Sequence, residues 1–558
     1  MARLLVLLLL AASLSAQSDL RQFLETYQQD RGALLRRWDA EYSPTRRARL
    51  VRFYEETQAA LRGQDFDRLN REGQVDYVLL DHRLTYERSL LDLEGRRAQD
   101  MAALVPFAPA VFHLHEQRRD LVHVDGRASA DTLVAIARRA DSVRAAMAAM
   151  DRARRPSRVT ALRTAEAVDG FRRLLREWYR FSEGYDPVFT WWTREPWGRA
   201  DSALMRMSQT IRRELLGVGQ GATEPIIGDP IGAEGMRADL AHEMIPYTPQ
   251  ELLAIGEREY AWAEAEMIRA SRELGFGDNW RQAVEHVKTL HREPGGQTEL
   301  SVELAREAEE WLLARELVTI PPLAREVWRM EMLSSERQRV APFYLGGETI
   351  LVAFPTDGMT HEEKLMSMRG NNPHFSRAVV HHELIPGHHL QGFMTNRYFP
   401  YRGMFGTPFW GEGWALYWEF RLYDLGFPRS AEDRVGMLFW RMHRAARIIF
   451  SLKFHLGEMT PQQAIDFLVD RVGHERANAE AEVRRSFNGT YPPLYQAGYM
   501  LGGLQIRALH AELVTTGRMT EREFHDAILQ GGRMPIAMVR ARLSGQALAR
   551  SGPAPWRF

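Results

Sequence analysis

A dense group of ionisable side chains lies in the run His381-His382-Glu383-Leu384-Ile385-Pro386-Gly387-His388-His389. A further acidic residue, Glu412, follows in the segment Gly411-Glu412-Gly413-Trp414-Ala415. Neutral imidazole nitrogens and carboxylate oxygens are ligands that Zn²⁺ takes in proteins, and a catalytic zinc site keeps three protein ligands and one position open for water. The sequence therefore predicts a zinc site and a metal-dependent hydrolase.

The spacing of the histidines departs from the usual zinc motif His-Glu-x-x-His, in which the two histidines share one face of a helix. Counted from His382, the fourth position is Pro386, and the next histidine is His388. Six residues of regular α-helix rise by about 9 Å, so these two side chains could not meet at one ion. Pro386 has no N–H group and Gly387 adopts conformations closed to other residues. We therefore expect a break, as a π-bulge or a wide turn, that returns His388 to the face of His382.

Three segments carry a resemblance to a known family: His382-Glu383-x-x-Pro386-Gly387-His388, Glu412-Gly-Trp-Ala-Leu-Tyr-Trp-Glu419 and Pro493-x-x-Gln496-Ala-x-Tyr499-x-x-Gly502. With them the chain resembles the DUF885 family of bacterial proteins, which looks like a distant branch of the gluzincin metallopeptidases. The resemblance covers most of the chain from about Ile231 onward. It implies a mainly α, two-lobed fold with a deep active-site cleft and a minor β element.

The second segment also resembles the Asn-Glu-Gly-Phe-Ala-x-Tyr-x-Glu segment of a family of zinc aminopeptidases, whose first glutamate is the third zinc ligand. The resemblance implies that Glu412 is a zinc ligand beside His382 and His388. Glu419, two turns further along the same face, is expected to accept a hydrogen bond from a ligating histidine. His389 is an alternative to His388 as the second histidine ligand, and otherwise a supporting residue near the metal.

Five residues are expected to act on the substrate. Glu383 would remove a proton from the zinc-bound water. Tyr499, together with His455, would donate a hydrogen bond to the oxyanion. Arg485 would bind a substrate carboxylate through its guanidinium fork, and Tyr495 would contact substrate or exchange roles with Tyr499. Three of these residues have an alternative, which is core packing for Tyr499, a structural role for His455 and an ion pair with an acidic residue for Arg485.

These residues together predict a zinc-dependent metallopeptidase, with one Zn²⁺ per chain, that hydrolyses short peptides. The limit to short peptides comes from the resemblance, because helical relatives bury the zinc in a deep channel. One alternative is a zinc hydrolase of non-peptide amides or esters. Another is an inactive binding protein, whose structural zinc would be closed by a fourth ligand such as His381 or His389.

The charge, the N-terminal segment and the cysteine content indicate which partners the protein binds and where in the cell it is found. The chain has 558 residues, with 73 basic and 73 acidic side chains, so no net charge attracts nucleic acid or anionic lipid. Residues 1–16 combine a short charged start, an apolar run and small residues up to Ala16, as in a secretory signal peptide. No other segment predicts membrane insertion. Because the chain has no cysteine, we expect an exported periplasmic or extracellular protein that is not a lipoprotein.

Helix patterns dominate the rest of the chain. Apolar residues recur with the helical period over residues 19–54, 64–93 and 128–183, and capping boxes begin at Thr248, Thr460 and Thr520. The best strand candidate is residues 347–353, and a Gly- and Pro-rich stretch at residues 217–235 predicts a lobe boundary. We expect an N-terminal helical region over residues 17–225 and a helical region with the zinc site over residues 226–558, together one continuous two-lobed domain.

Overall fold

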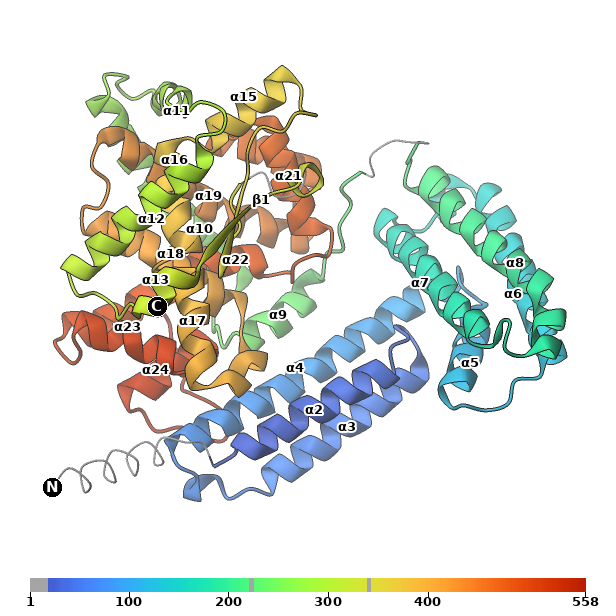
Figure 1. Cartoon of the computed structure of the whole chain (residues 1–558). Helices are drawn as coiled ribbons and strands as arrows, with labels where there is room; N and C mark the ends of the chain where they lie inside the picture. The colour runs from blue at the N-terminus through green and yellow to red at the C-terminus, as the bar shows by residue number, and fades with distance from the viewer. Residues whose placement is uncertain (1–18, 220–224, 339–342) are drawn as a thin grey trace. The chain divides into compact units, whose positions relative to one another are not determined.

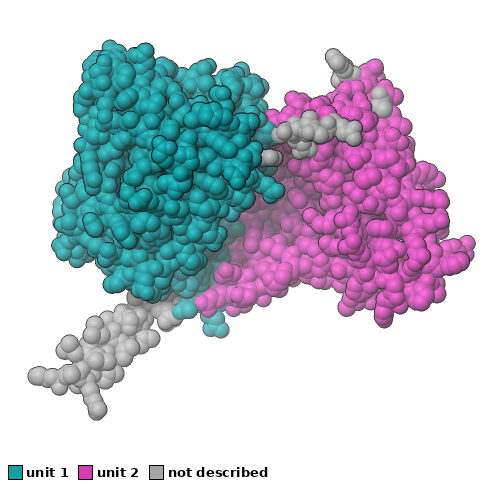
Figure 2. All heavy atoms as spheres, turned by 45° about the horizontal axis from the view of Figure 1, so that its top comes forward, with its two compact units in different colours: residues 1–24, 66–83, 230–558 teal, residues 25–65, 84–229 magenta. Residues whose placement is uncertain are grey.

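The computed structural model describes residues 19–219, 225–338 and 343–558, so the predicted signal peptide lies outside the described residues (Figure 1). Within the described residues most of the chain is helical and the strands are short, which confirms the mainly α fold. The chain divides into two compact units (Figure 2). Unit 1 comprises residues 1–24, 66–83 and 230–558, and unit 2 comprises residues 25–65 and 84–229. The boundary at residue 229 lies within the Gly- and Pro-rich stretch.

In unit 2, α8 packs against both α6 and α7, and Tyr179 of α7 stacks on Trp197 of α8 with ring centroids 4.3 Å apart. The helical pattern of residues 19–54 corresponds to two helices, because Ser43 caps a new helix that has Pro44 in its first turn. Two helices, α2 and α4, contain residues of both units. The helices are α2 (Arg21–Arg37), α3 (Pro44–Arg62), α4 (Arg71–Met101), α5 (Ala108–Arg119), α6 (Gly126–Ala148), η2 (Arg152–Arg154), α7 (Arg158–Ser182), α8 (Pro187–Thr210) and η3 (Ile211–Leu215).

Unit 1 contains the remaining elements. The capping boxes predicted at Thr248, Thr460 and Thr520 are present and begin α10, α20 and α23. Its helices are η1 (Phe66–Arg68), α9 (Gly232–His242), α10 (Pro249–Glu273), α11 (Trp280–Thr289), α12 (Gln297–Ala314), α13 (Pro322–Val327), α14 (Ser335–Gln338), α15 (His361–Gly370), α16 (Pro373–Glu383), α17 (His388–Tyr398), η4 (Pro400–Phe405), α18 (Pro408–Asp424), α19 (Ala431–His455), α20 (Pro461–Phe467), η5 (Leu468–Val472), α21 (Arg476–Phe487), α22 (Tyr495–His510), η6 (Ala511–Thr515), α23 (Glu521–Gln530) and α24 (Ile536–Ser544).

The minor β element consists of β1 (Arg329–Met332) and β2 (Thr349–Val352), which pair in parallel. The predicted strand at residues 347–353 contains β2. The loop that leads into β2 lies against Glu383, because a β-carbon on Gly346 would be 2.2 Å from Oε2 of Glu383. The β element is therefore next to the residues that were predicted to do chemistry.

Four helices, α16, α18, α19 and α22, lie together in the middle of unit 1 (Figure 1). Helices α18 and α22 approach closely, since a β-carbon on Gly413 would lie 2.6 Å from the Cα atom of Gly502. This close approach holds Glu412 of α18 next to Tyr495 and Tyr499 of α22. Helix α19 packs against both α16 and α22.

Candidate metal centre

The helix that carries His382 is broken before His388. Helix α16 ends at Glu383 and α17 begins at His388, and Leu384 between them has φ −104° and ψ −103°. A β-carbon on Gly387 would lie 1.7 Å from the carbonyl oxygen of His382, so only glycine fits at this position. The indole N–H of Trp414 donates to the carbonyl of Pro386 at 2.8 Å. The predicted break is present, and it separates two helices instead of forming a bulge within one.

The break brings His382 and His388 together with Glu412 of α18. One donor atom from each of these side chains lies within 4.8 Å of the other two, and among the described residues this is the only group of its kind. Oε2 of Glu412 lies 3.3 Å from Nε2 of His382 and 3.0 Å from Nε2 of His388. A tetrahedral zinc ion with bonds of about 2.05 Å separates its ligand atoms by roughly 3.3 Å. The donor types and both distances fit such an ion.

Glu419 orients the first of these histidines. Its Oε1 atom lies 2.7 Å from Nδ1 of His382 and 3.3 Å from Nη2 of Arg444. A hydrogen bond from Nδ1–H leaves the lone pair of Nε2 free to bind a metal. Burial opposes ionisation of Glu419, but Arg444 and His382 hold the pKa of its carboxyl below the usual value. The geometry agrees with the role expected for Glu419.

Glu412 is held as a carboxylate by its neighbours. Burial alone would raise its pKa, but His388 and His382 hold that pKa well below the usual range. Burial in turn lowers the pKa of His388, and the charge of Glu412 raises it to about 9. The hydroxyl of Tyr495 donates to Oε1 of Glu412. Tyr495, which was predicted to contact substrate, thus also fixes a candidate metal ligand.

Glu383 is buried at the end of α16, next to the three candidate ligands. Burial raises the pKa of its carboxyl, and the charges of His382, His388 and Glu412 also act on that pKa. A carboxylate with a raised pKa is a better proton acceptor near neutral pH than an ordinary one. Glu383 therefore has both the position and the environment of a general base.

Tyr499 lies beside His382, with the two rings nearly parallel and their centroids 6.0 Å apart. The guanidinium carbons of Arg444 and Arg447 lie 4.6 Å and 4.3 Å from the centre of the Tyr499 ring. These contacts hold the ring in place. The Tyr499 hydroxyl accepts and donates no hydrogen bond among the described residues, so it can donate to a ligand.

The two other histidines of the motif are directed elsewhere. Nε2 of His389 lies 2.7 Å from the carbonyl oxygen of Ala324, and the ring of His381 packs edge-on against Phe427. Burial lowers the pKa of His381 to about 3, so its ring is neutral. In the described part of the chain, neither histidine lies in the group formed by His382, His388 and Glu412. His388, and not His389, is therefore the candidate second ligand.

Two predicted residues, Arg485 and His455, lie outside the group of three candidate ligands, although Arg485 interacts electrostatically with Tyr499. Arg485 donates to the hydroxyl of Tyr491 at 3.0 Å, and Nη1 of Arg485 lies 3.9 Å from Oε2 of Glu482, so the ion-pair alternative describes it. His455 is the last residue of α19, about 12 Å of helix rise beyond Arg447. Its ring packs against Phe454 and Phe487. This packing favours the structural role for His455.

A cavity of about 410 Å³ opens beside His388 and Glu412, and Tyr495 and Arg533 also line it. Arg533 and the two arginines of α19 that contact Tyr499 were not predicted from the sequence. The spacing of Arg441, Arg444 and Arg447 by three residues could have indicated one charged helix face. Nothing in the segment around Arg533 distinguishes it from the other arginines.

The chain is similar to one protein family and to two solved structures, each over most of its length. The family model DUF885, described as "Bacterial protein of unknown function", matches residues 26–543. A solved structure of a putative lipoprotein of unknown function from Shewanella oneidensis is similar at a TM-score of 0.66 and 18% identity, over 94% of this chain and 99% of that one. A putative lipoprotein from Colwellia psychrerythraea is similar at a TM-score of 0.51 and 19% identity, over 75% of each chain. No curated protein matches the chain.

These structures correct the expectation that the protein is not a lipoprotein. Both proteins of similar fold are described as lipoproteins, which contradicts that prediction. The prediction relied on cysteine content alone. The number of cysteines in this one sequence does not show whether proteins with the same fold are lipoproteins. Separately, no helix among the described residues is long and apolar enough to cross a membrane.

Proposed function

Because the chain belongs to the DUF885 family, for which no function is described, we propose its function from the geometry of the candidate metal centre: a zinc-dependent metallopeptidase of the gluzincin type that hydrolyses short peptides. The observation that carries the proposal is the convergence of His382, His388 and Glu412 within 4.8 Å, with Glu383 beside them. Two imidazoles and one carboxylate, with an adjacent second carboxylate, are what hydrolytic zinc sites use.

His382, His388 and Glu412 would hold the ion. A Zn²⁺ ion bound there would lower the pKa of a water molecule and polarise the carbonyl under attack. Glu383 accepts the proton of the attacking water and delivers it to the leaving nitrogen. The free hydroxyl of Tyr499 donates to the carbonyl oxygen as negative charge develops on it. Glu419 and Tyr495 keep His382 and Glu412 in their orientations.

The number of candidate ligands supports catalysis over a structural zinc. Structural zinc sites are closed by four protein ligands, whereas catalytic sites have three. Within the described residues the group has three members, and the neighbouring His381 and His389 are directed at Phe427 and Ala324. The cavity beside His388 and Glu412 also gives a small substrate access to the open position.

The test combines metal analysis with digestion of a peptide library. We expect one zinc per chain by mass spectrometry and cleavage of short peptides. The Glu383→Gln variant should keep its zinc and lose at least a hundredfold in kcat, because general acid–base catalysis contributes about 10² to 10⁴. Glu257→Gln, at a half-exposed ion pair with Arg471, is the matched control. Wild-type protein that binds no zinc, or that binds zinc and cleaves neither peptides nor simple amides and esters, would refute the proposal.

A further inference from the structure

The cavity beside the candidate metal centre is lined by one arginine, Arg533, in addition to the candidate ligand His388. We propose that Arg533 binds the terminal α-carboxylate of the peptide, so that the enzyme cleaves close to the carboxyl end of its substrate. This inference rests on the proposed function and specifies its substrate class. Four features support it: the unneutralised charge of Arg533, the way its loop is held, the shape of the cavity and the position of the cavity next to the ligands.

The charge of Arg533 is not neutralised by the protein. Its side chain is half-buried, and no carboxylate pairs with it among the described residues. Nearby Arg402 shows the contrast, because it is fully buried and pairs with both Asp76 and Glu72 at 2.7 Å. Removing a guanidinium from water without a partner is costly, so an anionic ligand that entered the cavity would gain from pairing with it.

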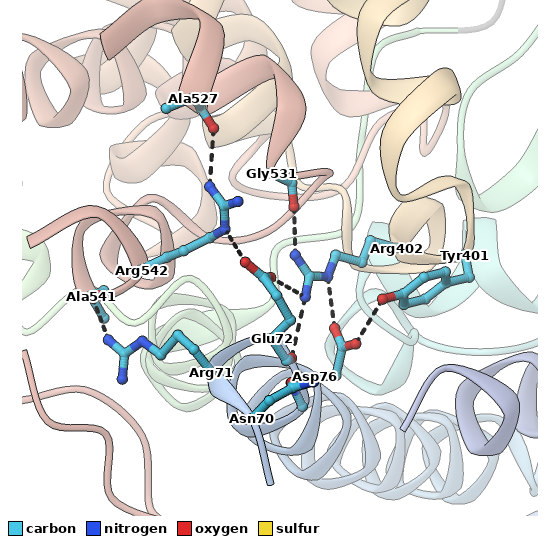
Figure 3. A network of polar contacts seen from close by, with 11 residues as sticks. Asn70, Arg71, Glu72, Asp76, Tyr401, Arg402, Ala527, Gly531, Ala541 and Arg542 are labelled. Carbon is cyan, nitrogen blue, oxygen red and sulfur yellow. Dashed lines mark hydrogen bonds and ion pairs between the residues drawn. The ribbon is translucent and has the colours of Figure 1, made fainter. Parts of the chain in front are cut away.

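A buried network holds the loop that carries Arg533 (Figure 3). Nη1 of Arg402 donates to the carbonyl oxygen of Gly531 at 2.6 Å, while its other nitrogens pair with the two acids of α4. Glu72 also pairs with Arg542 of α24 at 2.8 Å. The loop between α23 and α24 is therefore tied through Arg402 to α4, and α4 is tied through Glu72 to α24. Arg533 projects from a fixed backbone, which reduces the entropy lost when it binds a ligand.

The cavity has room for peptide backbone beside Arg533. Gly392, Gly403 and Gly411 line it, and a β-carbon on any of them would meet no atom within 4 Å. Its volume of about 410 Å³ is in the lower part of the range of roughly 300–1,000 Å³ found for small-ligand sites. A short end of a peptide fits this space better than the middle of a long one.

The chemistry selects the carboxyl end over the amino end. Guanidinium groups bind carboxylates through two parallel hydrogen bonds, and they repel the ammonium group of a peptide amino terminus. Since His388 and Glu412 line the same cavity, the bound carboxylate lies on the leaving-group side of the scissile bond. The released product is then a free amino acid or a very short peptide from the carboxyl end.

The experiment compares N-acetylated short peptides that have a free carboxyl terminus with the same peptides as C-terminal amides. Zinc-loaded wild-type protein should cleave the acids with a kcat/KM about ten to a hundred times that of the amides, as expected for one charged hydrogen-bonded pair. Arg533→Gln should remove this preference by raising KM for the acids, and it should leave the amides unchanged. Arg533→Lys, which keeps the charge without the fork, should retain part of the preference. Arg518→Gln, at an exposed position before α23, is the control.

A binding measurement tests carboxylate recognition by Arg533 independently of whether the protein cleaves peptides. Calorimetry with the same acids and amides and zinc-loaded Glu383→Gln protein measures recognition without turnover. Tighter binding of the acids, lost on Arg533→Gln, supports the inference even where no peptide is cleaved. Equal handling of acids and amides by protein with an intact Arg533 overturns it, and so does a preference that persists in Arg533→Gln. The first of these comparisons needs no Arg533 variant, so it holds if that variant fails to fold.

Discussion

Replacing Glu419 with glutamine tests whether the hydrogen bond between Glu419 and His382 strengthens zinc binding. Glu419 accepts from Nδ1 of His382 at 2.7 Å and pairs with Arg444 at 3.3 Å. Glutamine has nearly the same shape and can still accept the imidazole hydrogen bond through its amide oxygen. The substitution therefore removes the negative charge and leaves the geometry of His382 in place.

The size of the effect follows from the two contacts. A hydrogen bond to a charged group contributes about 1.5–3 kcal/mol and a neutral one about 0.5–1.5 kcal/mol, so the His382 contact loses about 1–1.5 kcal/mol. That difference corresponds to roughly a five- to twelvefold weaker zinc affinity. The unpaired charge of Arg444 adds a repulsion toward the bound cation. We expect the zinc dissociation constant to rise by about ten- to a hundredfold, the range seen when such supporting partners are removed.

Competition for zinc with a chromophoric chelator near neutral pH measures this change. Glu257→Gln removes a glutamate charge from a half-exposed ion pair in the same unit and should bind zinc like the wild type. Circular dichroism of the metal-free variant should match that of the wild type. An unchanged zinc affinity in Glu419→Gln with an intact fold would show that the contact between Glu419 and His382 does not serve metal binding.

Two further outcomes are expected. Tyr499→Phe should keep zinc and lower kcat by about 10² to 10³ with little change in KM, because it removes only an oxyanion donor; an unchanged kcat contradicts that role. Although burial opposes ionisation, Arg447 and Arg485 hold the pKa of Glu482 at about 2, against 4.5. This depressed pKa stabilises the fold above pH 4.5, and the stabilisation, about 3 kcal/mol in full, is lost as the pH falls toward 2. Urea unfolding at pH 6 and pH 3 should therefore show a smaller loss in Glu482→Gln than in the wild type, and parallel losses would refute the assignment.

Two of the three candidate ligands, His382 and His388, could be predicted from sequence because their signal is local, whereas the role of Glu412 came from the family resemblance. His382, Glu383, Pro386, Gly387 and His388 lie within one short segment, and the physical need for a break follows from helix geometry alone. The capping boxes could be predicted for the same reason, since each depends on residues three positions apart. The exact form of the break could not, because it depends on Trp414 holding the carbonyl of Pro386 from another helix.

The contacts that the sequence did not predict join distant segments. Tyr495 donates to Glu412 across 83 positions of the chain, and β1 pairs with β2 through strands of four residues each. Arg485 was predicted to bind substrate and Arg533 was not, because a sequence with as many acidic as basic side chains does not show which arginines pair with an acid of the protein. The three-dimensional structure determines which arginines form an ion pair with a carboxylate of the protein.

The arginines near the candidate metal centre fall into two kinds: those that pair with an acid of the protein and hold the site in place, and Arg533, which we propose binds the substrate. Arg444 pairs with Glu419, and Arg447 pairs with Glu482 at 2.6 Å, and both flank the ring of Tyr499. Losing one partner of such a buried pair is costly, but replacing both partners with well-packed apolar side chains often leaves stability unchanged. The value of these pairs therefore lies in fixing the side chains that they contact. Arg533 lines the cavity and has no such partner in the part of the chain that the structure describes. A substrate carboxylate would pair with Arg533 as Glu419 pairs with Arg444 and Glu482 with Arg447. The arginines beside Tyr499 would then support the candidate metal centre, and Arg533 would select the substrate.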